Sequence, residues 1–102
     1  MSNQQQQVEQ QFRLWLQHSG FYERGLFIDL QPQPAQLVAS VTKLSRGQRV
    51  LLGFFLTVYD PVLKRQYLPD LDVLAEVQAL SLNNRRMIAD WLEQPFYIAA
   101  GL

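Results

Sequence analysis

The sequence predicts an all-α fold, a small single-domain bundle of four to five helices. Three observations support this prediction. Apolar residues recur at helical spacing in the first, central and last thirds of the chain, serines suited to capping precede two of these stretches, and glycine or proline follows each of them. The alternative is an α+β fold in which residues 37–59 form a β-hairpin.

Length and composition indicate one ordinary globular domain covering residues 1–102, with residues 1–4 as a frayed polar tail. The chain has 102 residues, of which 48% are hydrophobic, and no Cys. A chain of this size buries enough surface to fold without a metal or a disulfide. Because Cys is absent, disulfide frameworks, thiolate metal sites and thiol catalysis are excluded, and a cytoplasmic location is favoured. We therefore expect no cofactor.

The N-terminal third contains a glutamine-rich helix over about residues 5–17. Gln forms helices well and carries no charge. Four apolar residues lie on one stripe of this helix: Val8, Phe12, Trp15 and Leu16. Gly20 is placed to end the helix in the left-handed conformation. The pattern over residues 21–30 is ambiguous, since it fits a short strand from Leu26 or a loose helical turn.

The segment after residue 30 is interrupted by Pro32 and Pro34, which lack an amide donor. Pro34 suits the first turn of a helix that reaches Lys43 or Leu44, although a strand over residues 37–41 competes. Residues 45–48 decide between the two folds. They form either a capping box between Ser45 and Gln48 or a hairpin loop around Gly47.

Residues 50–59 are apolar on every side, so their pattern fits both a helix and a strand. Leu51, Phe54, Phe55 and Val58 form a helical stripe, whereas alternate residues form a strand face. About twelve residues precede the stop at Asp60 and Pro61, which is longer than a typical strand. A buried helix is therefore the preferred interpretation.

Two further helices are predicted in the C-terminal half. Asp70 is placed to cap the first, with Val73, Val77 and Leu80 on one face. Ser81 is placed to cap the second, whose buried stripe contains Ile88, Trp91 and Leu92 and which Pro95 ends. The apolar tail over residues 96–102 must then be covered by the core or by a second subunit.

Catalysis receives little support from the sequence. His18 is the only histidine, and with no Cys it has no triad or metal set to join. Asp70, Asp72 and Glu76 lack the Gly-centred turn and the further oxygen ligands of a calcium loop. No glycine-rich phosphate-binding motif occurs. We therefore predict a protein that is not an enzyme and that binds neither metal nor cofactor.

A protein-interaction or adaptor module, soluble, cytoplasmic and self-associating as a homodimer, is the predicted function. The prediction rests on a surplus of apolar residues outside the strongly periodic elements. The candidate interface residues are Tyr22, Phe27, Phe96, Tyr97, Ile98 and Leu102. The protein partner is unknown. No membrane contact is expected, because the longest apolar run is far shorter than the roughly 20 residues that span a bilayer.

The alternative function is a small helix-turn-helix protein that binds nucleic acid. The last predicted helix begins with four residues suited to contacting bases or phosphates: Asn83, Asn84, Arg85 and Arg86. The predicted helix before it ends only a residue or two earlier, as in a helix-turn-helix motif. The chain has equal numbers of basic and acidic residues, nine of each. Because proteins that read DNA usually carry an excess of Lys and Arg, this alternative ranks second.

Overall fold

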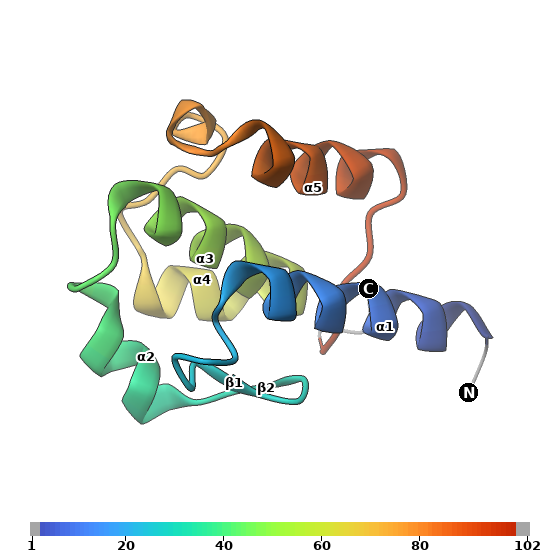
Figure 1. The fold of residues 1–102 in the computed structure, drawn as a ribbon, viewed down its shortest axis with the longest axis horizontal. Helices are drawn as coiled ribbons and strands as arrows, with labels where there is room; N and C mark the ends of the chain where they lie inside the picture. Colours follow the sequence, from blue (N-terminus) through green and yellow to red (C-terminus); the bar gives the residue numbers. More distant parts are fainter. Residues whose placement is uncertain (1–2, 100–102) are drawn as a thin grey trace. The chain divides into compact units, whose positions relative to one another are not determined.

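The computed structural model describes residues 3–99, which form a mainly helical chain (Figure 1). These residues contain five α-helices, a short 3-10 helix and a hairpin of two short strands. The predicted all-α class with up to five helices is thereby confirmed. The chain groups into two compact units, Met1–Thr42 and Lys43–Leu102, which are described in turn. The expected single-domain organisation stays a prediction.

The first unit begins with α1, Asn3–Ser19. Asn3 and Gln4 are helical, so the prediction of a frayed tail is wrong for these two residues, because the uncharged amide side chains favour helix. Residues 1 and 2 lie outside the described part. Phe12, Trp15 and Leu16 are buried, as the apolar stripe predicts. The helix ends at Gly20, whose φ of 81° is left-handed.

A hairpin follows the turn after α1 and resolves the ambiguity over residues 21–30. It pairs β1, Phe27–Ile28, with β2, Gln31–Pro32, in antiparallel register. Asp29 opens the two-residue loop with a φ of 51°. Two-residue hairpin loops require a positive φ at this position, and Asp tolerates it better than most residues. A short strand is therefore the correct alternative for this segment.

The α+β alternative for residues 37–59 is wrong, because this region is helical. It contains α2, Pro34–Val41, and α3, Arg46–Tyr59. The Ser45 hydroxyl accepts a 3.2 Å hydrogen bond from the Gln48 amide, and the Gln48 side-chain oxygen accepts one of 3.0 Å from the Ser45 amide. This capping box fixes the start of α3, and so Gly47 lies inside a helix and not in a loop.

The second unit is built around α3. Each residue from Val50 to Leu56 is buried, and so is Val58. This part of α3 is therefore covered on all of its sides. The short helix α4, Pro61–Tyr67, follows after Asp60 alone and packs against α3. The Asp60 side chain caps α4 by accepting a hydrogen bond from the Val62 amide. At seven residues α4 is too short to give a periodic pattern, and sequence analysis missed it.

The helix predicted over residues 70–80 is wrong, since this segment forms turns and the 3-10 helix η1, Val77–Ala79. The Asp72 carboxylate does not cap a helix but accepts a 3.0 Å hydrogen bond from the Ala75 amide, closing a local turn. Leu71 and Val73 lie against α3 at Gly53. This segment is therefore held by the packing of Leu71 and Val73 on α3 and by the hydrogen bond to the Asp72 side chain, and it does not form the expected helix.

The last helix, α5, Leu82–Glu93, begins as predicted, with the Ser81 hydroxyl accepting a hydrogen bond from the Asn84 amide. Ile88 is buried, and Trp91 meets Phe54 of α3 edge-on at 5.9 Å, but Leu92 is 54% exposed and its prediction as a buried residue is wrong. The helix ends before Pro95, and the red segment after it in Figure 1 turns back towards the C-terminal end of α3. None of the described helices is long and apolar enough to span a bilayer.

Candidate functional site

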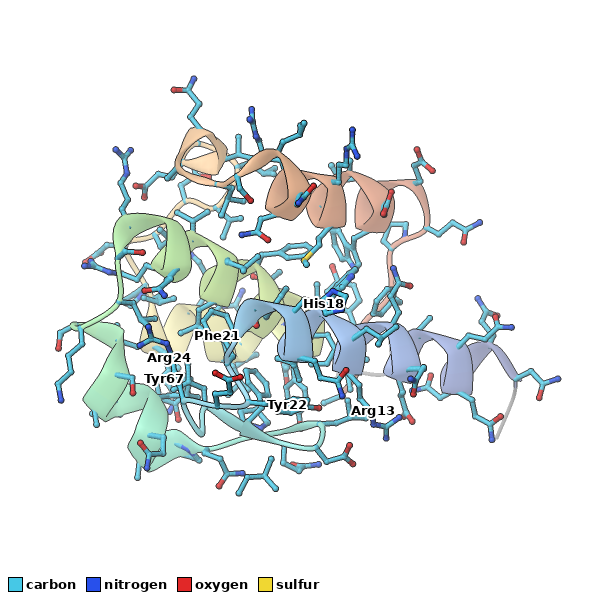
Figure 2. The ribbon with its side chains drawn as sticks, in the orientation of Figure 1. Arg13, His18, Phe21, Tyr22, Arg24 and Tyr67 are labelled. Carbon is cyan, nitrogen blue, oxygen red and sulfur yellow. The ribbon has the colours of Figure 1, made fainter. Side chains whose placement is uncertain are left out.

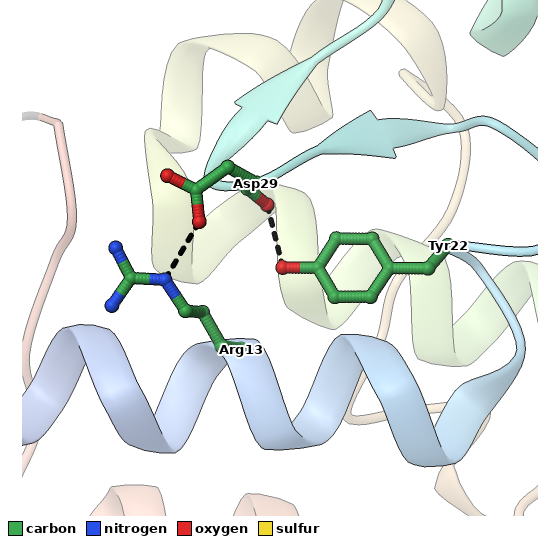
Figure 3. A network of polar contacts seen from close by, with 3 residues as sticks. All are labelled: Arg13, Tyr22 and Asp29. Carbon is green, nitrogen blue, oxygen red and sulfur yellow. Dashed lines mark hydrogen bonds and ion pairs between the residues drawn. The ribbon is translucent and has the colours of Figure 1, made fainter.

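The two predicted interface residues of the first unit have structural partners. Phe27 is only 1% exposed and packs edge-on against Phe12 at 5.9 Å, so it is a core residue and presents no surface to a partner. Tyr22 is half-buried, and its hydroxyl donates a 2.7 Å hydrogen bond to the Asp29 carbonyl oxygen (Figure 3). Sequence analysis missed both roles, because the hairpin that places Phe27 and Asp29 is formed by only two residues on each strand.

The polar network around Asp29 ties the hairpin to α1 (Figure 3). The Arg13 Nε donates to Asp29 Oδ1 at 2.7 Å, which lowers the pKa of the Asp29 carboxyl and raises the pKa of the Arg13 guanidinium. Burial raises the pKa of Tyr22. The phenol therefore stays protonated as a donor. Arg13 bonds to the Asp29 carboxylate and Tyr22 to the Asp29 carbonyl oxygen, so the network holds the hairpin loop against α1 and the turn that follows it.

The described part of the tail packs partly on its own unit. The amides of Ile98 and Ala99 donate to the carbonyl oxygens of Val58 and Tyr59 at 3.0 and 2.8 Å. Phe96, Tyr97 and Ile98 are half-buried. The sequence allowed the tail to pack on the core or on a second subunit, and the described part of the tail contacts the core. Leu102, the last predicted interface residue, lies outside the described residues.

The described side chains that could take part in catalysis or metal binding do not cluster at one site. His18 is exposed at the C-terminal end of α1, and Figure 2 shows Phe21, Tyr22 and Arg24 in the turns that follow it. Glu76 accepts a 3.1 Å ion-pair contact from Arg46. Within residues 3–99, no three His, Asp or Glu side chains approach closely enough to hold a metal ion.

The residues predicted to contact nucleic acid lie at the start of α5. Asn83, Arg85 and Arg86 are exposed, and Asn84 is half-buried. The helix that would have to precede α5 in a helix-turn-helix motif is absent from residues 70–80, where η1 has three residues. These four residues therefore lie on one helix without the two-helix frame on which their prediction rested.

Two surfaces that sequence analysis did not select stand out. The first, here called the amide face, is a side of α1 along an open hollow of about 500 Å³, lined by Asn3, Gln6, Gln7, Gln10, Gln11 and Leu14. The i, i+4, i+7 and i+11 spacing of Asn3, Gln7, Gln10 and Leu14 was a usable signal for it.

The second, here called the Leu71 surface, belongs to the second unit. Leu71 lines two neighbouring hollows of about 430 and 330 Å³. The side chains that define the surface are Arg46, Arg49, Lys64, Arg65, Leu71 and Leu74. They come from three segments, so no local sequence pattern indicates this surface.

Comparison of the chain with protein-family models, with curated proteins and with solved structures finds no match. Function is therefore inferred from the geometry of the chain itself. Among the described residues, the amide face and the Leu71 surface both border open hollows.

Proposed function

We propose that this chain is a non-enzymatic protein-interaction module with an adaptor role, and that it self-associates through the amide face of α1. The observation that carries the proposal is the composition of that face. The six lining residues among the described part of the chain are amides apart from Leu14, and none of these six carries a formal charge. Gln6, Gln7, Gln10 and Leu14 are exposed, Leu14 to 42%.

The charged side chains of α1 are engaged elsewhere. Glu9 accepts a 3.0 Å hydrogen bond from the side-chain amide of Gln5, and Arg13 pairs with Asp29 in the hairpin. Neither residue lines the hollow. Two copies of the amide face can therefore approach without repulsion between like charges at its centre.

A second copy of the chain is the occupant that suits this face. Each side-chain amide offers both donors and an acceptor, so one amide face is chemically complementary to another. A twofold axis presents the same surface twice, which requires such self-complementarity. The spacing of Asn3, Gln7, Gln10 and Leu14 follows the alternating steps of four and three with which paired helices meet.

Sedimentation equilibrium tests the proposal. We expect a dimer for the unaltered chain and a monomer for the Gln7→Lys, Gln10→Lys double variant, because the introduced ammonium groups would face their copies across the twofold axis. The control is the Gln78→Lys, Gln94→Lys double variant, which adds the same charge at two exposed residues of the second unit and should remain dimeric. A monomeric unaltered chain at high micromolar concentration, or equal dimerisation of both variants, would overturn the proposal.

The described tail has a different expected role. The Ile98 and Ala99 amides of the tail bond to the end of α3. We therefore expect truncation after Gln94 to lower the free energy of unfolding of the second unit and to leave the amide face intact. A truncated chain that stays folded but becomes monomeric would instead assign self-association to the tail.

A further inference from the structure

The Leu71 surface forms where the chain after α4 folds back over α3. At Gly53 of α3 an added Cβ would collide with the Leu71 Cδ2 and would lie 3.2 Å from Val73. Gly53 therefore provides the space in which Leu71 and Val73 settle on the helix. Leu74, the next residue, stays 62% exposed. The segment thus presents aliphatic side chains beside the α3–α4 hairpin.

Basic side chains surround these aliphatic residues. One hollow beside Leu71 is lined by Lys64 and Arg65 of α4, and the other by Arg46 and Arg49 of α3. Two carboxylates lie among them: Glu76 pairs with Arg46, and Asp72 accepts a hydrogen bond from the Ala75 amide.

The basic charge of the Leu71 surface is only partly neutralised. Among the described residues that line its hollows, four cations outnumber two carboxylates, although the chain as a whole is neutral. Arg49, Lys64 and Arg65 make no ion pair with any of the described residues. Acidic groups of a partner would form ion pairs with these exposed basic side chains and neutralise their charge.

We propose that the Leu71 surface binds an acidic, apolar segment of a partner protein. Aliphatic side chains of that segment would cover Leu74 and fill the hollows beside Leu71, while its carboxylates would face Lys64, Arg65 and Arg49. The inference rests on the adaptor role proposed above, to which it adds the chemistry of the partner. It places the two binding functions on different units of the chain.

An acidic protein segment fits this surface better than nucleic acid does. A phosphate backbone is held by Lys and Arg contacts and offers nothing to cover an exposed leucine. Leu74 is among the most exposed large aliphatic residues described, and Asp72 and Glu76 would repel phosphate groups. Nucleic acid is accordingly a competing outcome of the test.

The test uses the full chain and fluorescein-labelled synthetic probes, with fluorescence anisotropy as the readout. One peptide carries Glu and Leu at helical spacing, a second replaces its Leu with Ser, and a third replaces its Glu with Lys; a short DNA duplex is the fourth probe. We expect binding of the Glu/Leu peptide in preference to the other three, with affinity that falls as salt is raised.

Two pairs of variants locate the binding. Lys64→Glu with Arg65→Glu should lower the affinity for the Glu/Leu peptide by about tenfold, because two attractive charge pairs become repulsive. Arg85→Glu with Arg86→Glu on α5 makes the same change in charge and should leave the affinity unchanged. Likewise Leu74→Ser should weaken binding severalfold, and Leu92→Ser, at another exposed leucine, should not.

Each result either supports or overturns the inference. Preferential binding of the Glu/Leu peptide, lost only in the α4 and Leu74 variants, supports it. Binding of no peptide, equal loss in the control variants, or preferential binding of the duplex overturns it. Sedimentation of the same samples keeps self-association separate: a dimer that binds no peptide contradicts only this inference, and a monomer that binds it contradicts only self-association.

Discussion

The indole Nε1 of Trp91 donates a 2.7 Å hydrogen bond to the carbonyl oxygen of Phe96. The bond crosses Pro95, where α5 can no longer continue, and it sets the direction in which the tail leaves the helix. The Tyr97 ring then meets the same indole edge-on at 5.7 Å. One side chain of α5 thus holds both the backbone and a ring of the segment that reaches the end of α3.

Replacing Trp91 with Phe should therefore loosen the tail while keeping an aromatic ring beside Phe54. Loss of the donor should lower the free energy of unfolding by about 0.5–1.5 kcal/mol, as for other internal hydrogen bonds. Urea denaturation measures this loss, and amide hydrogen exchange should show reduced protection at Ile98 and Ala99. Unchanged protection at these two amides would show that the tail is held without the indole.

Contact between Gly53 and Leu71 gives a second prediction. In Gly53→Ala the new methyl group meets Leu71, which should cost about 1–3 kcal/mol of overpacking, offset by up to about 1 kcal/mol of helix propensity. Leu71→Ala removes the obstacle. The double variant should therefore be more stable than the sum of the two single changes predicts, by about 0.5 kcal/mol or more.

A double-mutant cycle from denaturant titrations measures this coupling. Gly53→Ala combined with Leu92→Ala is the matched control, because Leu92 is an exposed leucine of α5 and is not among the side chains that a Cβ at Gly53 would meet. Additive effects in both cycles would mean that Leu71 does not rest on the Gly53 position.

Local side-chain chemistry made much of the helical fold predictable. Ser45 and Gln48 bond to each other's amides within four residues, so the capping box at the start of α3 can be predicted from that stretch alone. Ser81 likewise caps α5 from the adjacent residue. The α+β alternative arose in part because α3 is buried on all sides, which removes the polar face that distinguishes a helix from a strand.

Tertiary packing accounts for the features that the sequence did not predict. Residues 70–80 carry helical spacing, yet Leu71 and Val73 settle at Gly53 and Asp72 bonds to the Ala75 amide. Phe27 lacks a periodic element around it, and it becomes a core residue by tertiary packing that includes its edge-on contact with Phe12. The Leu71 surface is likewise assembled from separate segments, whereas the amide face could be predicted from its spacing in α1 alone.

The Arg13–Asp29 pair gives the last prediction, which concerns pH. The Arg13 guanidinium bonds to the Asp29 carboxylate and holds the pKa of Asp29 below that of an ordinary aspartate. A depressed folded-state pKa adds stability above the unfolded-state pKa of about 4. This stability is lost as the pH falls through the folded-state value. Carboxyl NMR titration should find a lowered pKa that returns towards the ordinary value in Arg13→Ala but not in Arg24→Ala, the exposed control; an ordinary pKa in the unaltered chain would show that the pair does not form in solution.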